Sequence, residues 1–190
     1  MPQAILHTER VHLVPLSAEH LEYQVELDSD PEVMRYLGGA LTRQQVEKEL
    51  HEALADADRA AGLGYWAGFV EGHFAGYWIL RPPGPIDQEP AEGQGELGYR
   101  LLRCHWRQGL GSEGSRELIR HGFEDLGLTR ICAMTAADNT ASRATMAAAG
   151  LQHVHDFRAD PSDFPPGTDL RAVEYAIVRE QWKGPNGRRW

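Results

Sequence analysis

The stretch ELGYRLLRCHWRQGLGSEG, residues 96–114, joins a candidate strand to a candidate helix through a loop that contains glycines. Residues 96–102 have the aromatic and aliphatic content of a strand, and apolar positions recur at helical spacing from Leu110 onward. The first backbone N–H groups of a helix have no partner inside it and carry partial positive charge. Glycines at this point remove Cβ atoms and let a phosphate approach several N–H groups at once. The stretch predicts a phosphate-binding loop; a glycine-rich connection without a ligand is the alternative.

Two familiar phosphate loops do not account for this stretch. The P-loop, G-x-x-x-x-G-K-[ST], requires a lysine that is absent here. Gly109, Gly111 and Gly114 approach the dinucleotide pattern G-x-G-x-x-G, but that pattern belongs in the first strand–helix–strand unit of a parallel sheet. Four candidate strands are already complete before these glycines. A nucleotide-binding regulatory domain is therefore kept only as an alternative.

Hydrophobic periodicity outside this stretch predicts an α/β chain with a mixed sheet. We expect about seven strands, at 9–16, at a 65–80 hairpin that turns at Glu71-Gly72, and at 96–102, 130–136, 151–157 and 172–178. We expect about four helices, which begin at the N-cap Ser17, at the capping box Thr42 to Gln45, near Gly109 and at 139–149. The strand–helix alternation in the middle implies right-handed parallel crossovers, whereas the hairpin and the last strand are antiparallel. The expected organisation is a single domain over residues 1–190.

The composition is that of an ordinary globular chain of 190 residues, 42% of them hydrophobic and 25% charged. The net charge of −9 argues against a general nucleic-acid binder, which needs a basic surface. No apolar segment follows a basic start at the N-terminus, and no apolar run approaches the roughly 20 residues that span a bilayer. The two cysteines, Cys104 and Cys132, fit a reducing compartment. These features predict a cytoplasmic protein that binds neither nucleic acid nor membranes.

The segment Arg107-Gln108-Gly109-Leu110-Gly111-Ser112 resembles the acetyl-CoA pyrophosphate loop of the GNAT superfamily of N-acetyltransferases, roughly [QR]-x-x-G-x-[GA]. The first position of the strict pattern holds Trp106 here, but the backbone donors of 107–112 do not depend on that side chain. Further segments resemble the branch that includes the Rim-type ribosomal-protein N-terminal acetyltransferases: TERVHLVPL, DPEVMRYLGG, GELGYRL and DNTASRATMAAAGL. Together these segments cover most of residues 8–182.

The resemblance implies a single-domain GNAT-like acyl-CoA N-acyltransferase fold, in which the strand at 96–102 splays from the strand at 130–136. The pantetheine arm of acetyl-CoA fills the gap like an inserted strand. The implied cofactor contacts are the backbones of Tyr99, Arg100 and Leu101 for the arm, Arg107, Gln108, Gly109, Leu110, Gly111 and Ser112 for the diphosphate, and Asn139 and Ser142 for the pantetheine and its sulfur. Exposed edge groups of a sheet are costly unless a partner satisfies them, which agrees with such a role.

Acyl transfer requires a neutral amine to attack the thioester and a thiol to leave. Many relatives have a tyrosine seven residues after the asparagine as general acid; that position is Met146 here, which has no proton to give. We therefore expect Ser142, directly or through water, to protonate the thiolate, or no side chain at all. The alternative for Asn139 and Ser142 is that they only cap and open a helix.

Glu96 and Asp156 are the candidate general bases. Burial in a cleft raises the pKa of a carboxylate toward neutrality, which suits this role. The alternatives are that both are solvated surface carboxylates and that a chain of waters serves as the base.

A metal site and a covalent intermediate are not expected. His153 and His155 are expected to share one face of a strand, a spacing compatible with a metal, but zinc requires three or four ligands and no partner cluster is evident. Cys104 has no placed histidine and carboxylate to activate it.

The expected acceptor is a primary amine of a protein N-terminus or of a small molecule such as an antibiotic or polyamine. It would enter between the long surface loops 81–95 and 158–171. These loops carry six acids that suit a cation, Asp87, Glu89, Glu92, Asp160, Asp163 and Asp169; a solvated rim is the alternative. A non-catalytic CoA-binding sensor or scaffold is a further alternative, and a homodimer is plausible for this branch.

Overall fold

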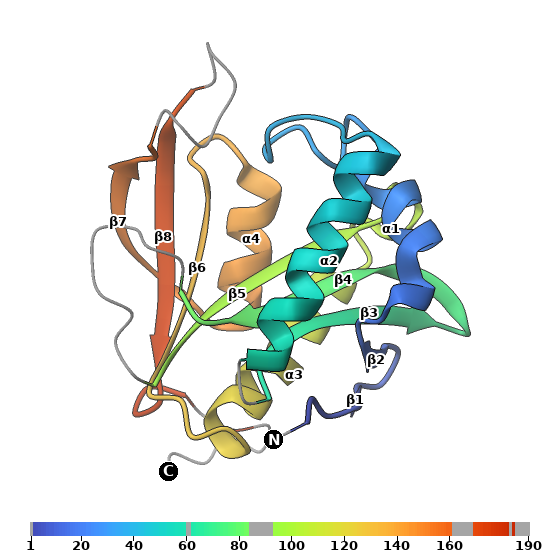
Figure 1. Ribbon diagram of the computed structural model, residues 1–190. Coiled ribbons are helices and arrows are strands. Elements are labelled where there is room, and N and C mark those ends of the chain that lie inside the picture. The colour runs from blue at the N-terminus through green and yellow to red at the C-terminus, as the bar shows by residue number, and fades with distance from the viewer. Residues whose placement is uncertain (1, 60–61, 84–92, 161–168, 183, 185–190) are drawn as a thin grey trace.

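The computed structural model describes residues 2–59, 62–83, 93–160, 169–182 and 184. Within these residues eight strands form one sheet in the order β1-β2-β3-β4-β5-β6-β8-β7 (Figure 1). The strands are β1 Leu6–His7, β2 His12–Pro15, β3 Gly64–Val70, β4 His73–Arg81, β5 Gln94–Leu101, β6 Arg130–Ala136, β7 Gln152–Arg158 and β8 Arg171–Val178. The helices are α1 Leu21–Asp28, α2 Arg43–Arg59, α3 Leu110–Glu124 and α4 Thr140–Ala149, with short 3-10 turns at Ala18–His20 and Arg103–His105.

The mixed sheet and the four helices confirm the expected fold class. The additional strand is β1. A turn stands at the start of the segment expected at 9–16, and it lets β1 fold back and pair with β2. The N–H of Thr8 donates to the carbonyl of Val11 (2.9 Å), and the N–H of Val11 donates to the Thr8 hydroxyl (2.8 Å). The expected hairpin turns at Glu71 and Gly72, with φ of 50° and 81°. Two left-handed residues in a row form the turn that matches the twist of paired strands.

The sheet divides between β5 and β6. These two strands pair in parallel only through three residue pairs, Gln94 with Arg130, Gly95 with Ile131 and Glu96 with Cys132. Beyond this point β5 continues to pair with β4 as far as Leu101, while β6 continues to pair with β8 as far as Ala136. The two strands therefore diverge, and β5 leaves an unpaired edge over residues 97–101. β6 and β7 run in the same direction, but β8 lies between them and pairs antiparallel with both. Among the described residues, the parallel pairing of the sheet is therefore that of β5 with β6.

Helices cover both faces of the central strands (Figure 1). Side chains alternate between the two faces of a strand, so Tyr77 and Trp78 on β4 belong to different cores. Tyr77 packs in a cluster with Leu27 of α1 and Leu50 of α2, and Trp78 packs with the buried side chains of α3. None of the helices in the described ranges has the length and apolar character needed to cross a bilayer.

Candidate functional site

The loop before α3 presents a row of backbone donors. Arg107 and Gly109 have φ of 58° and 77°, and α3 begins at the next residue, Leu110. Left-handed residues alternating with others turn successive N–H groups to one side, which forms an anion-binding concavity. In the part of the chain that the structure describes, the N–H groups of residues 107 to 112 donate to no protein acceptor. The loop can therefore offer them, together with the helix dipole, to a phosphate.

The three glycines of this stretch have different structural roles. Gly109 supplies the left-handed conformation at the N-cap of α3. Gly111 permits close approach of α4, since a Cβ there would lie 3.2 Å from Cγ2 of Thr145. Gly114 belongs to the core, because a Cβ would lie 2.4 Å from Nε1 of Trp78. Only the first two glycines therefore serve the loop.

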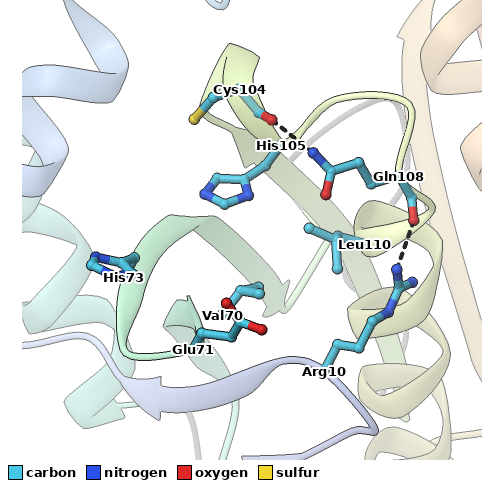
Figure 2. A pocket seen from close by; sticks show the side chains of 8 residues that line it. All are labelled: Arg10, Val70, Glu71, His73, Cys104, His105, Gln108 and Leu110. Atoms are coloured by element: carbon cyan, nitrogen blue, oxygen red, sulfur yellow. Dashed lines mark hydrogen bonds between the residues drawn. The ribbon is translucent and has the colours of Figure 1, made fainter.

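The N-terminal segment anchors this loop. Arg10 donates through Nε and Nη2 to Glu113 (2.7 and 2.5 Å) and through Nη1 to the carbonyl of Gln108 (3.0 Å). Burial acts to raise the pKa of Glu113, but hydrogen bonds from Thr8 and Arg10 hold that pKa below its usual value. Figure 2 shows the Arg10 guanidinium at the carbonyl of Gln108, and both residues line a cavity of about 540 Å³. The loop is thus held by a residue nearly one hundred positions away in sequence.

Arg10→Ala is expected to raise the Kd of CoA about 3- to 10-fold, which corresponds to the roughly 0.5–1.5 kcal/mol of one lost hydrogen-bonding group. The variant loses the anchor on the Gln108 carbonyl and a positive charge beside the loop. Isothermal titration with CoA measures the change. Arg43→Ala is the matched control, because Arg43 also binds a glutamate, Glu22 (2.5 Å), but lies on α2. Equal affinities for CoA in both variants would contradict the anchoring role.

A second cavity of about 600 Å³ lies along the same loop, lined by Arg103, Cys104, Trp106 and Arg107. The Trp106 ring is 42% exposed and its Nε1 donates to the carbonyl of Leu101 (2.7 Å), which fixes the indole. Guanidinium groups beside an exposed indole suit the phosphate and base of a nucleotide. Cys104 lines both cavities and is exposed. Among the described residues, no group of three or more metal-binding side chains is present.

The unpaired edge of β5 faces the gap with its backbone donors. The N–H of Leu102 donates to the carbonyl of Ala75, just beyond β5 and on the β4 side (2.9 Å). Successive N–H groups along a strand point to opposite sides, so the N–H groups of Leu101 and Tyr99 point away from β4, into the gap. This is the direction that the expected pairing with a pantetheine arm requires.

The start of α4 lies beside this gap. Asn139 is the N-cap of α4: its Oδ1 accepts from the N–H of Ser142 (3.1 Å) and its Nδ2 donates to the Thr135 hydroxyl (3.1 Å). Asn139 therefore caps α4, and its contact with pantetheine, which stays a prediction, would use its remaining lone pair or N–H. Met146 is buried in the core at 1% exposure and takes no part.

Sequence reasoning missed the side chain of Tyr99. Its hydroxyl lies 3.0 Å from the carbonyl oxygen and 3.1 Å from Oγ of Ser142. Burial raises the pKa of the Tyr99 phenol, against hydrogen bonds with Ser142 and Thr145. The period of a strand predicts that Tyr99 and Arg100 face opposite ways, but only the packed fold identifies which face meets α4.

The opposite face of β5 carries a buried ion pair that the sequence did not reveal. Arg100 donates through Nη1 to Oδ1 of Asp28 (2.9 Å), the last residue of α1, and Asp28 is fully buried. Burial raises the pKa of Asp28, while the Arg100 charge opposes this rise. Three buried atoms here have no protein partner: Oε1 of Gln24, Oδ2 of Asp28 and the hydroxyl of Tyr77. This polar cluster ties α1, on the side away from α3 and α4, to the strand at the gap.

The structure separates Glu96 from Ser142 but not Asp156. Glu96 is on the same side of β5 as Arg100, opposite Tyr99, and it binds Arg81 (3.2 Å). Its parallel partner is Cys132, whose pKa is raised to about 11 by burial. Asp156 lies on the edge strand β7, binds Nε2 of His153 (2.7 Å) and pairs with Val173, which packs in the same core as Met146 of α4. Asp156 therefore lies on the face that α4 covers and Glu96 on the opposite face, and the role of each as a base stays a prediction.

The expectation that His153 and His155 share one strand face is wrong. A bulge between them lets His153 pair with Tyr175 and His155 pair with Glu174. Cross-strand partners share a face and adjacent residues of β8 do not, so the two imidazoles point to opposite faces. Of the six acids in the long loops, Asp87, Glu89, Glu92 and Asp163 lie outside the described residues. Asp169 is bound by Arg171 (2.6 Å).

Comparisons with known proteins agree with this geometry. Residues 10–152 match the model of the acetyltransferase (GNAT) domain family. The chain is 42% identical over 187 residues to FsC-acetyl coenzyme A-N(2)-transacetylase of Aspergillus fumigatus, which covers 95% of this chain and 78% of that protein. It is 31% identical to the uncharacterized N-acetyltransferase p20 of Bacillus licheniformis over 72% of this chain and 76% of that protein. The fold resembles RimL in complex with coenzyme A, with a TM-score of 0.76, 16% identity and coverage of 92% and 98%.

Proposed function

The chain belongs to the GNAT acetyltransferase family, and we propose that it acetylates a primary amine of a small molecule. The observation that supports acetyl-CoA as the acyl donor is the row of unpartnered N–H groups at 107 to 112, beside the gap between β5 and β6. These groups hold the diphosphate of acetyl-CoA, and the pantetheine arm runs along the unpaired edge at Tyr99, Arg100 and Leu101. The N–H of Leu101 polarises the thioester carbonyl.

The acceptor enters on the α1 and α2 face, and its amine attacks the thioester directly while both substrates are bound. One feature supports a small molecule over a protein N-terminus: the relative with 42% identity is an N(2)-transacetylase named for FsC. The likeness to RimL has 16% identity and speaks for the fold alone. The net charge of −9 favours the approach of a cationic amine of either kind. A cytoplasmic location, which the sequence suggests, and a homodimer, which the resemblance suggests, belong to the same proposal.

A panel of acceptors tests this function. The small amines to test are polyamines and FsC, the compound for which the 42% identical relative is named. We expect the kcat/KM for thiol release from acetyl-CoA to be at least about 10-fold higher with such amines than with peptides that have free N-termini. Mass spectrometry of the product identifies the acetylated nitrogen. A preference for peptides would replace the small-molecule proposal by a Rim-type activity.

CoA alone is expected to stabilise the chain, because a ligand that binds only the native state adds about 2.7 kcal/mol to the free energy of unfolding at 100 times its Kd. Urea unfolding with and without CoA measures this. CoA binding without thiol release with any amine would support a sensor or scaffold and contradict catalysis. Greater stabilisation by ATP or NAD than by CoA would contradict the cofactor assignment.

A further inference from the structure

The departure of the CoA thiolate raises a question that the family pattern does not answer for this chain. The position that often carries an acidic tyrosine holds Met146, which is buried in the core. Ser142 is half-buried at the start of α4, beside the gap, but an alkyl hydroxyl is a poor proton donor when it acts alone. A second hydroxyl is in place to help it.

Tyr99 reaches Ser142 from β5. Its ring packs between α3 and α4, since a Cβ at Gly111 would lie 3.8 Å from Cδ2 of Tyr99 and 3.2 Å from Cγ2 of Thr145. Its hydroxyl lies 3.1 Å from Oγ of Ser142 and 3.0 Å from the carbonyl of the same residue. Asn139 fixes the backbone of Ser142 from the other side (3.1 Å). The two hydroxyls thus meet in a fixed geometry next to the unpaired edge of β5.

We propose that Tyr99 is a positioning residue: it orients Ser142 as the proton donor to the leaving thiolate and returns a proton to the Ser142 hydroxyl. This inference rests on the proposed function. As the new C–N bond forms and the C–S bond breaks, Ser142 gives its proton to the sulfur and receives one from the Tyr99 hydroxyl. The tyrosine regains a proton from water, and the amine nitrogen loses its own proton to water. The net transfer is one proton from amine to thiol.

The contact between Tyr99 and Ser142 explains why position 146 can hold a methionine where relatives often have a tyrosine. A phenol hydroxyl supplied from β5 replaces the one that relatives supply from α4, so the buried position on α4 is free to become apolar. The Tyr99 phenol is protonated at neutral pH, and because burial raises its pKa further it enters the reaction with its proton in place.

Tyr99→Phe tests the proposal because it removes the hydroxyl and keeps the ring. We expect kcat to fall about 10- to 100-fold, while the KM and Kd of acetyl-CoA stay within about twofold. Ser142→Ala is expected to lower kcat at least as much, and the double variant Tyr99→Phe/Ser142→Ala to be no slower than Ser142→Ala. Such non-additivity is the signature of two groups that act as one unit.

Tyr175→Phe is the matched control, because the Tyr175 hydroxyl also accepts from α4, from Nε of Arg143 (3.4 Å), but lies on β8. It is expected to retain wild-type kcat. A Tyr99→Phe enzyme with wild-type kcat, a loss confined to KM, or multiplicative losses in the double variant would each overturn the proposal. If Tyr99→Phe is unstable, Ser142→Ala still tests the proposal, because wild-type kcat in that variant would overturn it. A wild-type chain that binds CoA but releases no thiol with any amine overturns the proposed function, and this inference with it.

Discussion

Replacing Gly109 and Gly111 together by alanine raises the expected Kd of CoA by about 100-fold, or roughly 2.7 kcal/mol. A left-handed alanine costs about 1–2 kcal/mol, so Gly109→Ala favours a rotated peptide that turns its N–H groups away from the diphosphate. Gly111→Ala places a Cβ 3.2 Å from Cγ2 of Thr145 and pushes α3 away from α4. Titration of the folded variant with CoA measures the loss.

The matched control for this variant is Gly127→Ala. Gly127 is also left-handed (φ 73°), and a Cβ there meets nothing within 4 Å. It has the same conformational cost as Gly109→Ala but lies beyond the far end of α3. We expect its CoA affinity to match that of the wild type. Unchanged CoA affinity in a folded Gly109→Ala/Gly111→Ala chain would contradict the diphosphate loop itself.

Gly76→Ala is expected to lower the free energy of unfolding by at least about 3 kcal/mol. A Cβ there would lie 2.1 Å from the carbonyl oxygen of Arg100 and 2.7 Å from Cα of Leu101, at a φ of 150°. Both atoms belong to the backbone, so relief requires β4 and β5 to separate where Gly76 pairs with Leu101. The midpoint of urea unfolding measures the loss. Because the same segment of β5 faces the gap, CoA affinity is expected to fall as well.

Gly72→Ala provides the comparison within the same hairpin. Gly72 has a φ of 81° and open space around its Cβ position, so the expected loss is about 1 kcal/mol, conformational in origin. Equal losses of stability in Gly72→Ala and Gly76→Ala would mean that the close approach of β4 and β5 contributes nothing.

The elements that local patterns define could be predicted from the sequence. Thr42 and Gln45 form the expected cap of α2, with Oε1 of Gln45 accepting from the N–H of Thr42 (2.8 Å). The hairpin turns where Glu71 and Gly72 indicate, and β6 spans the expected 130–136. These features depend on residues within a few positions of one another. Periodicity and turn chemistry therefore suffice to find them.

The parts of the site that depend on distant residues could not be predicted in this way. Asp28 is the last residue of α1, and its ion-pair partner Arg100 lies seventy-two positions later in the sequence. Glu96 stays a predicted base, but only the packed sheet shows that the alternation of β5 puts it on the face opposite Tyr99, the one that α1 and α2 cover. The bulge that separates His153 from His155 leaves no signal in the alternating pattern QHVHDF. Each case needs the partner strand or helix to be in place.

The few pairs that join β5 to β6 have a consequence for the lifetime of the protein in a cell. The two leaves of the sheet pair through three residue pairs and otherwise share a hydrophobic core, so without a ligand the seam between them is a natural place for local opening and proteolysis. A molecule that lies along the seam stabilises both leaves by mass action. The steady-state amount of the chain would then rise and fall with the supply of its acyl donor, so that abundance and activity respond together to metabolic state.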